Sequence, residues 1–139
     1  MRLKKVLTVS LSLFIGFSAF ADHLSDKLTF TARLDGKNNT TVVNADAHGI
    51  ATFFLNATRD TMQVNIAVSN LSRPMVAAHI HEVAAGTDGA VILPLDAFIE
   101  GDVIRTTITG ATLTNSLSKF FDGSFYVNIH TEQGAIFVS

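Results

Sequence analysis

Alternation of apolar and polar residues with a period of two is the feature that most constrains this chain. The pattern recurs in four segments, at residues 28–34, 49–56, 61–69 and 103–109. Successive side chains of a strand point to opposite faces, so the pattern predicts half-buried β-strands. Shorter strands are expected at residues 40–44, 75–82, 90–93, 124–131 and 135–138. About eight short strands separated by turns favour an all-β antiparallel sandwich or barrel.

One segment departs from this period. Leu113, Leu117, Phe120 and Phe121 recur at helical spacing, and Asp122-Gly123 follows them as a typical helix end. We therefore expect one short helix over residues 113–121. A hairpin is expected where residues 57–60 join two alternating segments.

The first 21 residues have the pattern of a secretory signal peptide. Met1–Lys5 is basic, residues 6–20 are largely apolar, and Ala19-Phe20-Ala21 is a small-x-small cleavage pattern. The apolar run has 15 residues, fewer than the ~20 that span a bilayer. We predict cleavage after Ala21, which leaves one domain over residues 22–139, exported to the periplasm or the extracellular space without a transmembrane anchor.

Charge and composition exclude several classes of function. Cleavage leaves 7 of the 10 basic residues and all 12 acidic ones, so the net charge falls from −2 to −5. An acidic domain does not suit nucleic acid, whereas a protein partner, a small ligand or a metal ion remains open. The chain has no cysteine, which excludes disulfides, Cys-ligated zinc and iron–sulfur clusters.

Three of the five histidines carry the strongest chemical signal. His79 and His81 flank Ile80, so on a strand both imidazoles share one face. His130 shares a face with Tyr126 and Asn128, opposite Val127 and Ile129. If Ile80 and these two residues face the core, the histidines lie on the side that water and ions reach. On neighbouring strands the three imidazoles could converge on one copper or zinc ion.

A simpler interpretation stays open, because H-x-H pairs are common and histidines also satisfy loop hydrogen bonds, here next to residues 86–89. Glu82, Asp88 and Glu132 are candidate fourth ligands or acceptors for the imidazole N–H groups, or else solvated surface acids. His23 and His48 lie apart from this group in the sequence.

The same segments carry a family resemblance. The residues are Ala77–His81, Gly86–Val91 (GTDGAV), Gly123–Thr131 (GSFYVNIHT) and Gly134, with Gly49–Phe53 (GIATF) upstream. Together they resemble the CHRD domain, named after chordin and found in many bacterial exported proteins. The resemblance covers most of residues 28–138.

The resemblance implies an immunoglobulin-like β-sandwich related in shape to copper/zinc superoxide dismutases, without an agreed biochemical activity. The motif residues carried over are His79, His81, Tyr126, Asn128 and His130. The E-V-P-P segment of the family is absent, and Ala135 and Phe137 replace the Glu and Arg of its closing G-E-I-R-G. A dinuclear centre like that of the dismutases needs at least six histidines and an aspartate, and this chain has five histidines.

These observations predict an exported, non-enzymatic binding or structural module of the CHRD type, with one copper or zinc ion at His79, His81 and His130. The alternative is a mononuclear metal-dependent enzyme, redox or hydrolytic, at the same histidines. A catalytic metal keeps an open coordination position, which would distinguish the two.

Overall fold

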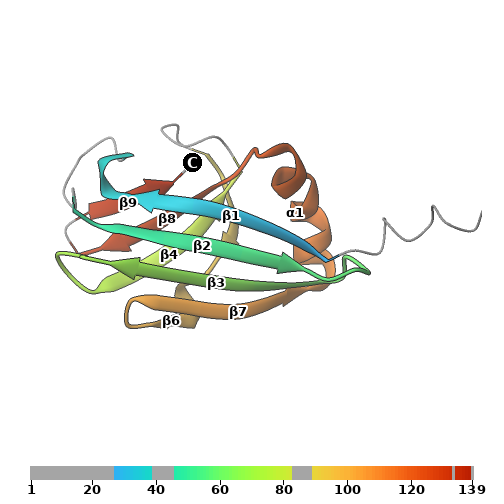
Figure 1. Ribbon diagram of the computed structural model, residues 1–139, viewed down its shortest axis with the longest axis horizontal. Coiled ribbons are helices and arrows are strands. Elements are labelled where there is room, and N and C mark those ends of the chain that lie inside the picture. Colours follow the sequence, from blue (N-terminus) through green and yellow to red (C-terminus); the bar gives the residue numbers. More distant parts are fainter. Residues whose placement is uncertain (1–26, 39–45, 83–88, 133, 139) are drawn as a thin grey trace, which may run out of the picture.

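A computed structural model describes residues 27–38, 46–82, 89–132 and 134–138 of the 139-residue chain (Figure 1). The predicted signal peptide and the expected strand at 40–44 lie outside these ranges. Within them are nine strands, β1 (Leu28–Asp35), β2 (His48–Leu55), β3 (Thr61–Ser69), β4 (Met75–His81), β5 (Val91–Pro94), β6 (Ile99–Glu100), β7 (Val103–Thr109), β8 (Tyr126–Thr131) and β9 (Gly134–Val138). The helices are α1 (Gly110–Asp122) and two 3₁₀ turns, η2 (Gly36–Asn38) and η3 (Asp96–Phe98).

The strands form two layers. All pairs are antiparallel, in the order β5-β4-β8-β9-β1-β2-β3-β7-β6. β1, β2, β3 and β7 lie side by side in front, and β4 and β8 lie behind them (Figure 1). Between the layers β1 pairs with β9 through two residues only, Leu34 with Val138 and Asp35 with Phe137. The predicted all-β antiparallel sandwich with one helix is confirmed.

The core lies between the two layers and follows from the period-two pattern. Every second residue of β2, namely Ala51, Phe53 and Leu55, is fully buried. Ile80 of β4 and the alternating apolar residues of β3 and β8 are buried against them. Full burial of one such large side chain stabilises the fold by roughly 1.5–3 kcal/mol. This burial therefore determines which face of each strand points inward.

The helix α1 closes one end of the sandwich (Figure 1). Leu113 and Phe120 of α1 are buried, and the Phe120 ring lies 5.0 Å from Phe53 and 4.4 Å from Phe125, centroid to centroid. Gly123, at φ 72°, ends the helix in the left-handed conformation that glycine adopts without strain. The predicted helix is confirmed and begins three residues earlier than expected. None of the helices in the described ranges is long and apolar enough to cross a membrane.

The predicted strands within the described ranges are confirmed to within two residues at each end, and β2 and β3 form the expected hairpin. The pattern did not predict β6, because Ile99 and Glu100 form a two-residue strand too short to show a period. It also did not predict the 3₁₀ turn η3, which matters for the site described below.

Candidate histidine site

Strands β4 and β8 are neighbours, as the histidine hypothesis requires. His79 pairs with Asn128, His81 with Tyr126, and Ala77 with His130. Ile80, Val127 and Ile129 point to the opposite face and are fully buried in the core. This burial directs the three histidines, Tyr126 and Asn128 to the other face of the layer.

The three imidazoles form a contiguous group with His79 in the middle. Its ring centroid lies 5.8 Å from that of His81 and 5.1 Å from that of His130, both edge to face. All three residues are half-buried, and the His79 side chain retains 22% of its exposure. The face is less open than the sequence suggested, because Tyr126 and Asn128 are buried beside the histidines.

His81 is held in one orientation. Its ring stacks on Tyr126, with centroids 4.8 Å apart and planes 9° from parallel. Its Nδ1 lies 2.7 Å from the carbonyl oxygen of Gly89, which can only accept, so Nδ1 carries the proton. In the neutral imidazole Nε2 then carries the lone pair, and this atom is buried and without a hydrogen-bond partner in the described part of the chain.

Among the described residues, Asp96 is the acidic residue that reaches the histidines, and sequence reasoning missed it. It opens the 3₁₀ turn η3, where Leu95 N–H donates to the Ala78 carbonyl at 2.8 Å and docks the turn on β4. Asp96 Oδ1 accepts from Ala78 N–H at 2.7 Å and lies 3.4 Å from His79 Nε2. No motif or period marks an aspartate fifteen residues beyond His81, so the sequence carried no signal for it.

The acids chosen from the sequence are placed differently. Glu82 lies 3.8 Å from the Lys119 ammonium of α1, and Glu132 is exposed after β8. Asp88 lies outside the described residues. Of the two motif residues beside the histidines, Tyr126 accepts a hydrogen bond from Gly89 N–H at 3.3 Å. Asn128 is buried, and its Oδ1 has no partner among the described residues.

Electrostatics favour a neutral His130. Burial lowers its pKa below the usual 6.5, and the neighbouring His79 and His81 lower it further, while the Asp96 carboxylate acts in the opposite direction. A neutral imidazole is the form that binds a metal ion. In the described ranges, however, no three His, Cys, Asp or Glu side chains are arranged so that they hold a metal ion. The rings are adjacent, but their nitrogens do not form a ready ligand set.

Comparison with known families identifies the domain. The family model of the CHRD domain matches residues 30–135. This chain belongs to the CHRD family. No curated protein and no solved structure matches it.

The match places the whole histidine face within the CHRD domain. The matched range begins in β1 and ends in β9, so it includes β4, β8 and the turn that carries Asp96. The family resemblance drawn from the histidine and tyrosine motifs is thereby confirmed.

Proposed function

We propose that this CHRD domain is an exported, non-enzymatic binding module that holds one Zn²⁺ or Cu²⁺ ion at His79, His81 and His130. The observation that carries the proposal is the state of His81. Its Nδ1–H donates to a backbone carbonyl while Nε2 is buried without a partner. Histidines that bind metals usually have this arrangement, with one nitrogen anchored and the other free to coordinate. A buried acceptor without a partner is otherwise costly, by roughly 1–3 kcal/mol.

The neighbouring side chains supply the remaining ligands. His79 and His130 come from adjacent positions of the same face, with rings 5.1 Å apart. Metal–nitrogen bonds of about 2.0–2.1 Å require these two rings to turn toward His81 Nε2. The 22% exposure of the His79 side chain leaves it room to turn. Asp96, 3.4 Å from His79 Nε2, then serves as a fourth ligand or as the acceptor that orients His79.

The donor set selects the metal class. Three imidazoles with one carboxylate suit zinc or copper, whereas calcium and magnesium require several oxygen ligands. The chain has no cysteine, so binding of a soft metal must rest on imidazole nitrogen.

The test is metal binding by residues 22–139 carrying His23→Ala, which removes a histidine next to the expected mature N-terminus. Calorimetric titration with Zn²⁺ and with Cu²⁺ is expected to give one ion per chain. His81→Ala is expected to abolish binding, and His48→Ala, an exposed histidine of β2, serves as the matched control. Two-dimensional ¹H–¹⁵N spectra of the histidine rings are expected to show that zinc shifts His81 Nε2 while Nδ1 stays protonated. Binding well below one ion per chain, or equal to wild type in His81→Ala, would refute the site.

Export rests on the signal pattern of residues 1–21. Expression of the full chain in a Gram-negative host, followed by intact-mass measurement of the periplasmic fraction, is expected to give a chain that begins at Asp22. Recovery of the uncleaved chain from the cytoplasm alone would contradict export.

A further inference from the structure

The layer formed by β1, β2, β3 and β7 has a second face, turned away from the core, which we call the outer sheet face. The strand register places its side chains in three rows of four, and these are Thr29-Phe54-Gln63-Thr107, Thr31-Thr52-Asn65-Arg105 and Arg33-Ile50-Ala67-Val103. Eight of these twelve residues carry a hydroxyl, amide or guanidinium group. The histidine site lies on the other layer, so this face is separate from the proposed metal site.

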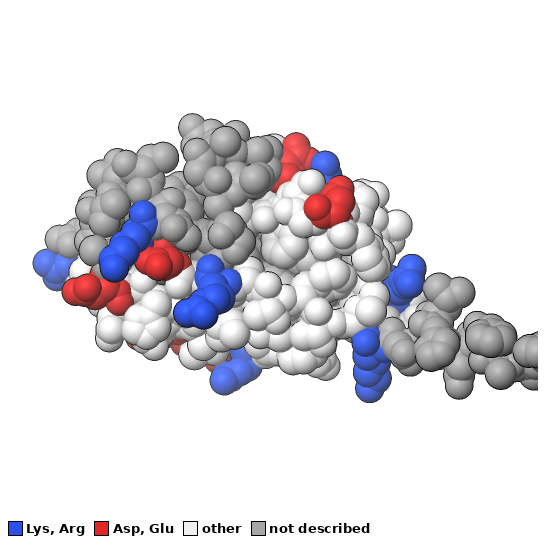
Figure 2. All heavy atoms as spheres, turned by 45° about the horizontal axis from the view of Figure 1, so that its top comes forward, with Lys and Arg blue, Asp and Glu red and all other residues white. Residues whose placement is uncertain are grey.

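The charge of the outer sheet face differs in sign from that of the whole chain. Arg33 and Arg105 lie within the rows, and Lys27 precedes β1 at the end of the strand away from Arg33. The three rows contain no Asp or Glu, and the next row toward the end of β1, Asp35-His48-Ser69, adds one exposed acidic residue. Basic residues thus outnumber acidic ones on this face. Figure 2 shows this face obliquely, with basic side chains standing apart on it and acidic ones lying mainly toward its ends. The face therefore complements an anionic ligand, although the chain carries a net negative charge.

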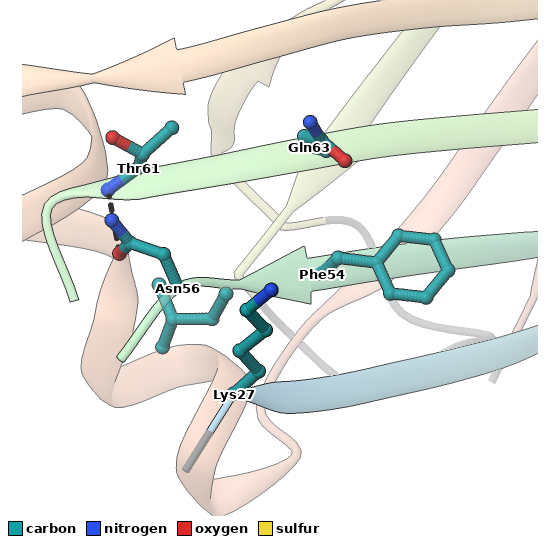
Figure 3. Close-up of a pocket in the computed structure, with 6 residues that line it drawn as sticks. Lys27, Phe54, Asn56, Thr61 and Gln63 are labelled. Atoms are coloured by element: carbon teal, nitrogen blue, oxygen red, sulfur yellow. Dashed lines mark hydrogen bonds between the residues drawn. The ribbon is translucent and has the colours of Figure 1, made fainter. Parts of the chain in front are cut away.

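Two shallow hollows on this face meet at Gln63. The first is lined by Lys27, Phe54, Asn56 and Thr61 together with Gln63 (Figure 3). Phe54 is 43% exposed, so much of its ring is open to solvent. The second hollow is lined by Gln63, Asn65, Arg105, Thr106 and Thr107. An aromatic subsite thus lies next to a subsite of amides and a guanidinium.

The polar groups of the second hollow are not used by the fold. The side chains of Gln63, Asn65 and Arg105 make no hydrogen bond or ion pair with another residue in the described ranges. Asn56 differs, because its amide holds the β2–β3 loop through Thr58, Asp60 and Thr61. The exposed Gln63 amide, the half-buried Asn65 amide and the exposed Arg105 guanidinium have no structural partner and are available to bind a ligand.

We propose that the outer sheet face binds an acidic polysaccharide built from uronate sugars. One sugar ring packs its C–H face on Phe54, as apolar faces pack on aromatic rings. Gln63 and Asn65 exchange hydrogen bonds with sugar hydroxyls, and Arg105 pairs with a carboxylate in the planar fork geometry that guanidinium favours. Lys27 and Arg33 pair with further carboxylates along the polysaccharide.

The spacing of the cations favours a uronate polymer over more densely charged ligands. Arg33 and Arg105 stand three strand spacings and one row apart, which at ~4.8 Å per strand and ~3.3 Å per residue along a strand is about 16 Å. Such sparse charge suits a ligand with one carboxylate per sugar. A phospholipid surface or a nucleic acid, whose binding rests on many phosphate contacts, would require a denser basic patch.

The experiment measures binding of residues 22–139 to polygalacturonate oligosaccharides by calorimetry, in 150 mM salt with EDTA so that no metal bridges the two. Phe54→Ala and Arg105→Gln are each expected to weaken binding at least about tenfold. The matched controls are Phe98→Ala, a phenylalanine with 42% exposure outside this face, and Arg73→Gln, an exposed arginine of the β3–β4 loop. Both controls are expected to bind as the wild type does.

Each other outcome overturns the proposal. Absence of binding, or equal binding by the Phe54→Ala and Arg105→Gln variants, removes the site. Equal binding of neutral dextran removes the role of the cations. Tighter binding of heparin, of duplex DNA or of phosphatidylglycerol vesicles assigns the face to another class of ligand. Since the buffer holds no free metal ion, failure here leaves the proposed metal site untouched.

Discussion

The ring of His81 lies parallel to the ring of Tyr126, with 4.8 Å between centroids and 9° between planes. The two residues face each other across β4 and β8, and both reach the same residue of the following segment. Gly89 accepts from His81 Nδ1 through its carbonyl and donates to the Tyr126 hydroxyl through its N–H. The ring stack and the two hydrogen bonds to Gly89 together fix the orientation of the His81 imidazole, so that its Nε2 points away from Gly89.

Substitution of Tyr126 separates the two parts of this arrangement. Tyr126→Phe keeps the stack and removes the hydroxyl, so the free energy of unfolding is expected to fall by about 1 kcal/mol. Tyr126→Ala removes a ring that is 1% exposed and is expected to cost about 3–5 kcal/mol. Urea denaturation followed by circular dichroism measures both. Equal losses for the two variants would mean that the ring itself contributes little.

The sequence predicted the side of each strand on which a side chain lies better than it predicted how deeply that side chain is buried. Ile80 between two histidines, and Val127 and Ile129 between polar residues, were enough to place the imidazoles together, because apolar burial determines strand orientation. The same alternation predicted Tyr126 and Asn128 on an open face, and they are buried. Alternation says which side a residue faces, whereas its burial depends on segments packed against that side from elsewhere in the chain.

Asp96 shows the same limit. Its approach to His79 depends on the hydrogen bond from Leu95 to Ala78 and on the 3₁₀ turn that follows β5. These contacts arise from tertiary packing, for which a single sequence has no period. The acids nearest to the histidines in sequence were chosen instead, and Glu82 lies against Lys119.

His130 is expected to titrate below 6.5 in the metal-free protein, because burial and the neighbouring histidines disfavour its charged form. The unfolded chain then takes up the proton first as the pH falls. The free energy of unfolding contributed by this group therefore declines as pH drops through 6.5, and the decline stops below the folded-state pKa. Proton NMR titration of the imidazole signals measures the pKa. A value at or above 6.5 would contradict the burial of this ring.

Gly49 is expected to tolerate no side chain. It lies in β2 opposite Val68, and a Cβ atom there would overlap the carbonyl oxygen of Ala67 on the neighbouring strand. Gly49→Ala must push β2 and β3 apart, at a cost of about 1–3 kcal/mol or more. The control is Gly101→Ala, where no atom lies near the added methyl group and only the positive φ is strained. Thermal melting compares the two, and a smaller loss for Gly49→Ala would contradict the clash.

Adjacent phenylalanines of α1 are expected to differ in their contribution to stability. Phe120 is 4% exposed and packs on Phe53 and Phe125, so Phe120→Ala is expected to lower the free energy of unfolding by about 3–5 kcal/mol. Phe121 is 49% exposed and contacts Phe30 and the Arg59 guanidinium, and its loss is expected to cost about 1–2 kcal/mol. Chemical denaturation of both variants measures the difference. A reversed order would mean that α1 is rotated relative to the sandwich.

Asp96 is expected to act on both the fold and the metal site, and two variants separate these roles. Asp96→Asn keeps an acceptor for Ala78 N–H and removes the charge near His79, so stability changes little while Zn²⁺ affinity falls by about 10–100-fold. The lost carboxylate also lowers the pKa of His130 further, since it was the group that raised it. Asp96→Ala additionally leaves the Ala78 N–H without its partner and is expected to cost about 1–3 kcal/mol of stability. Zinc titration, NMR and urea denaturation measure the three effects. A loss of stability without any change in zinc affinity or in the His130 pKa would restrict Asp96 to holding the turn on β4.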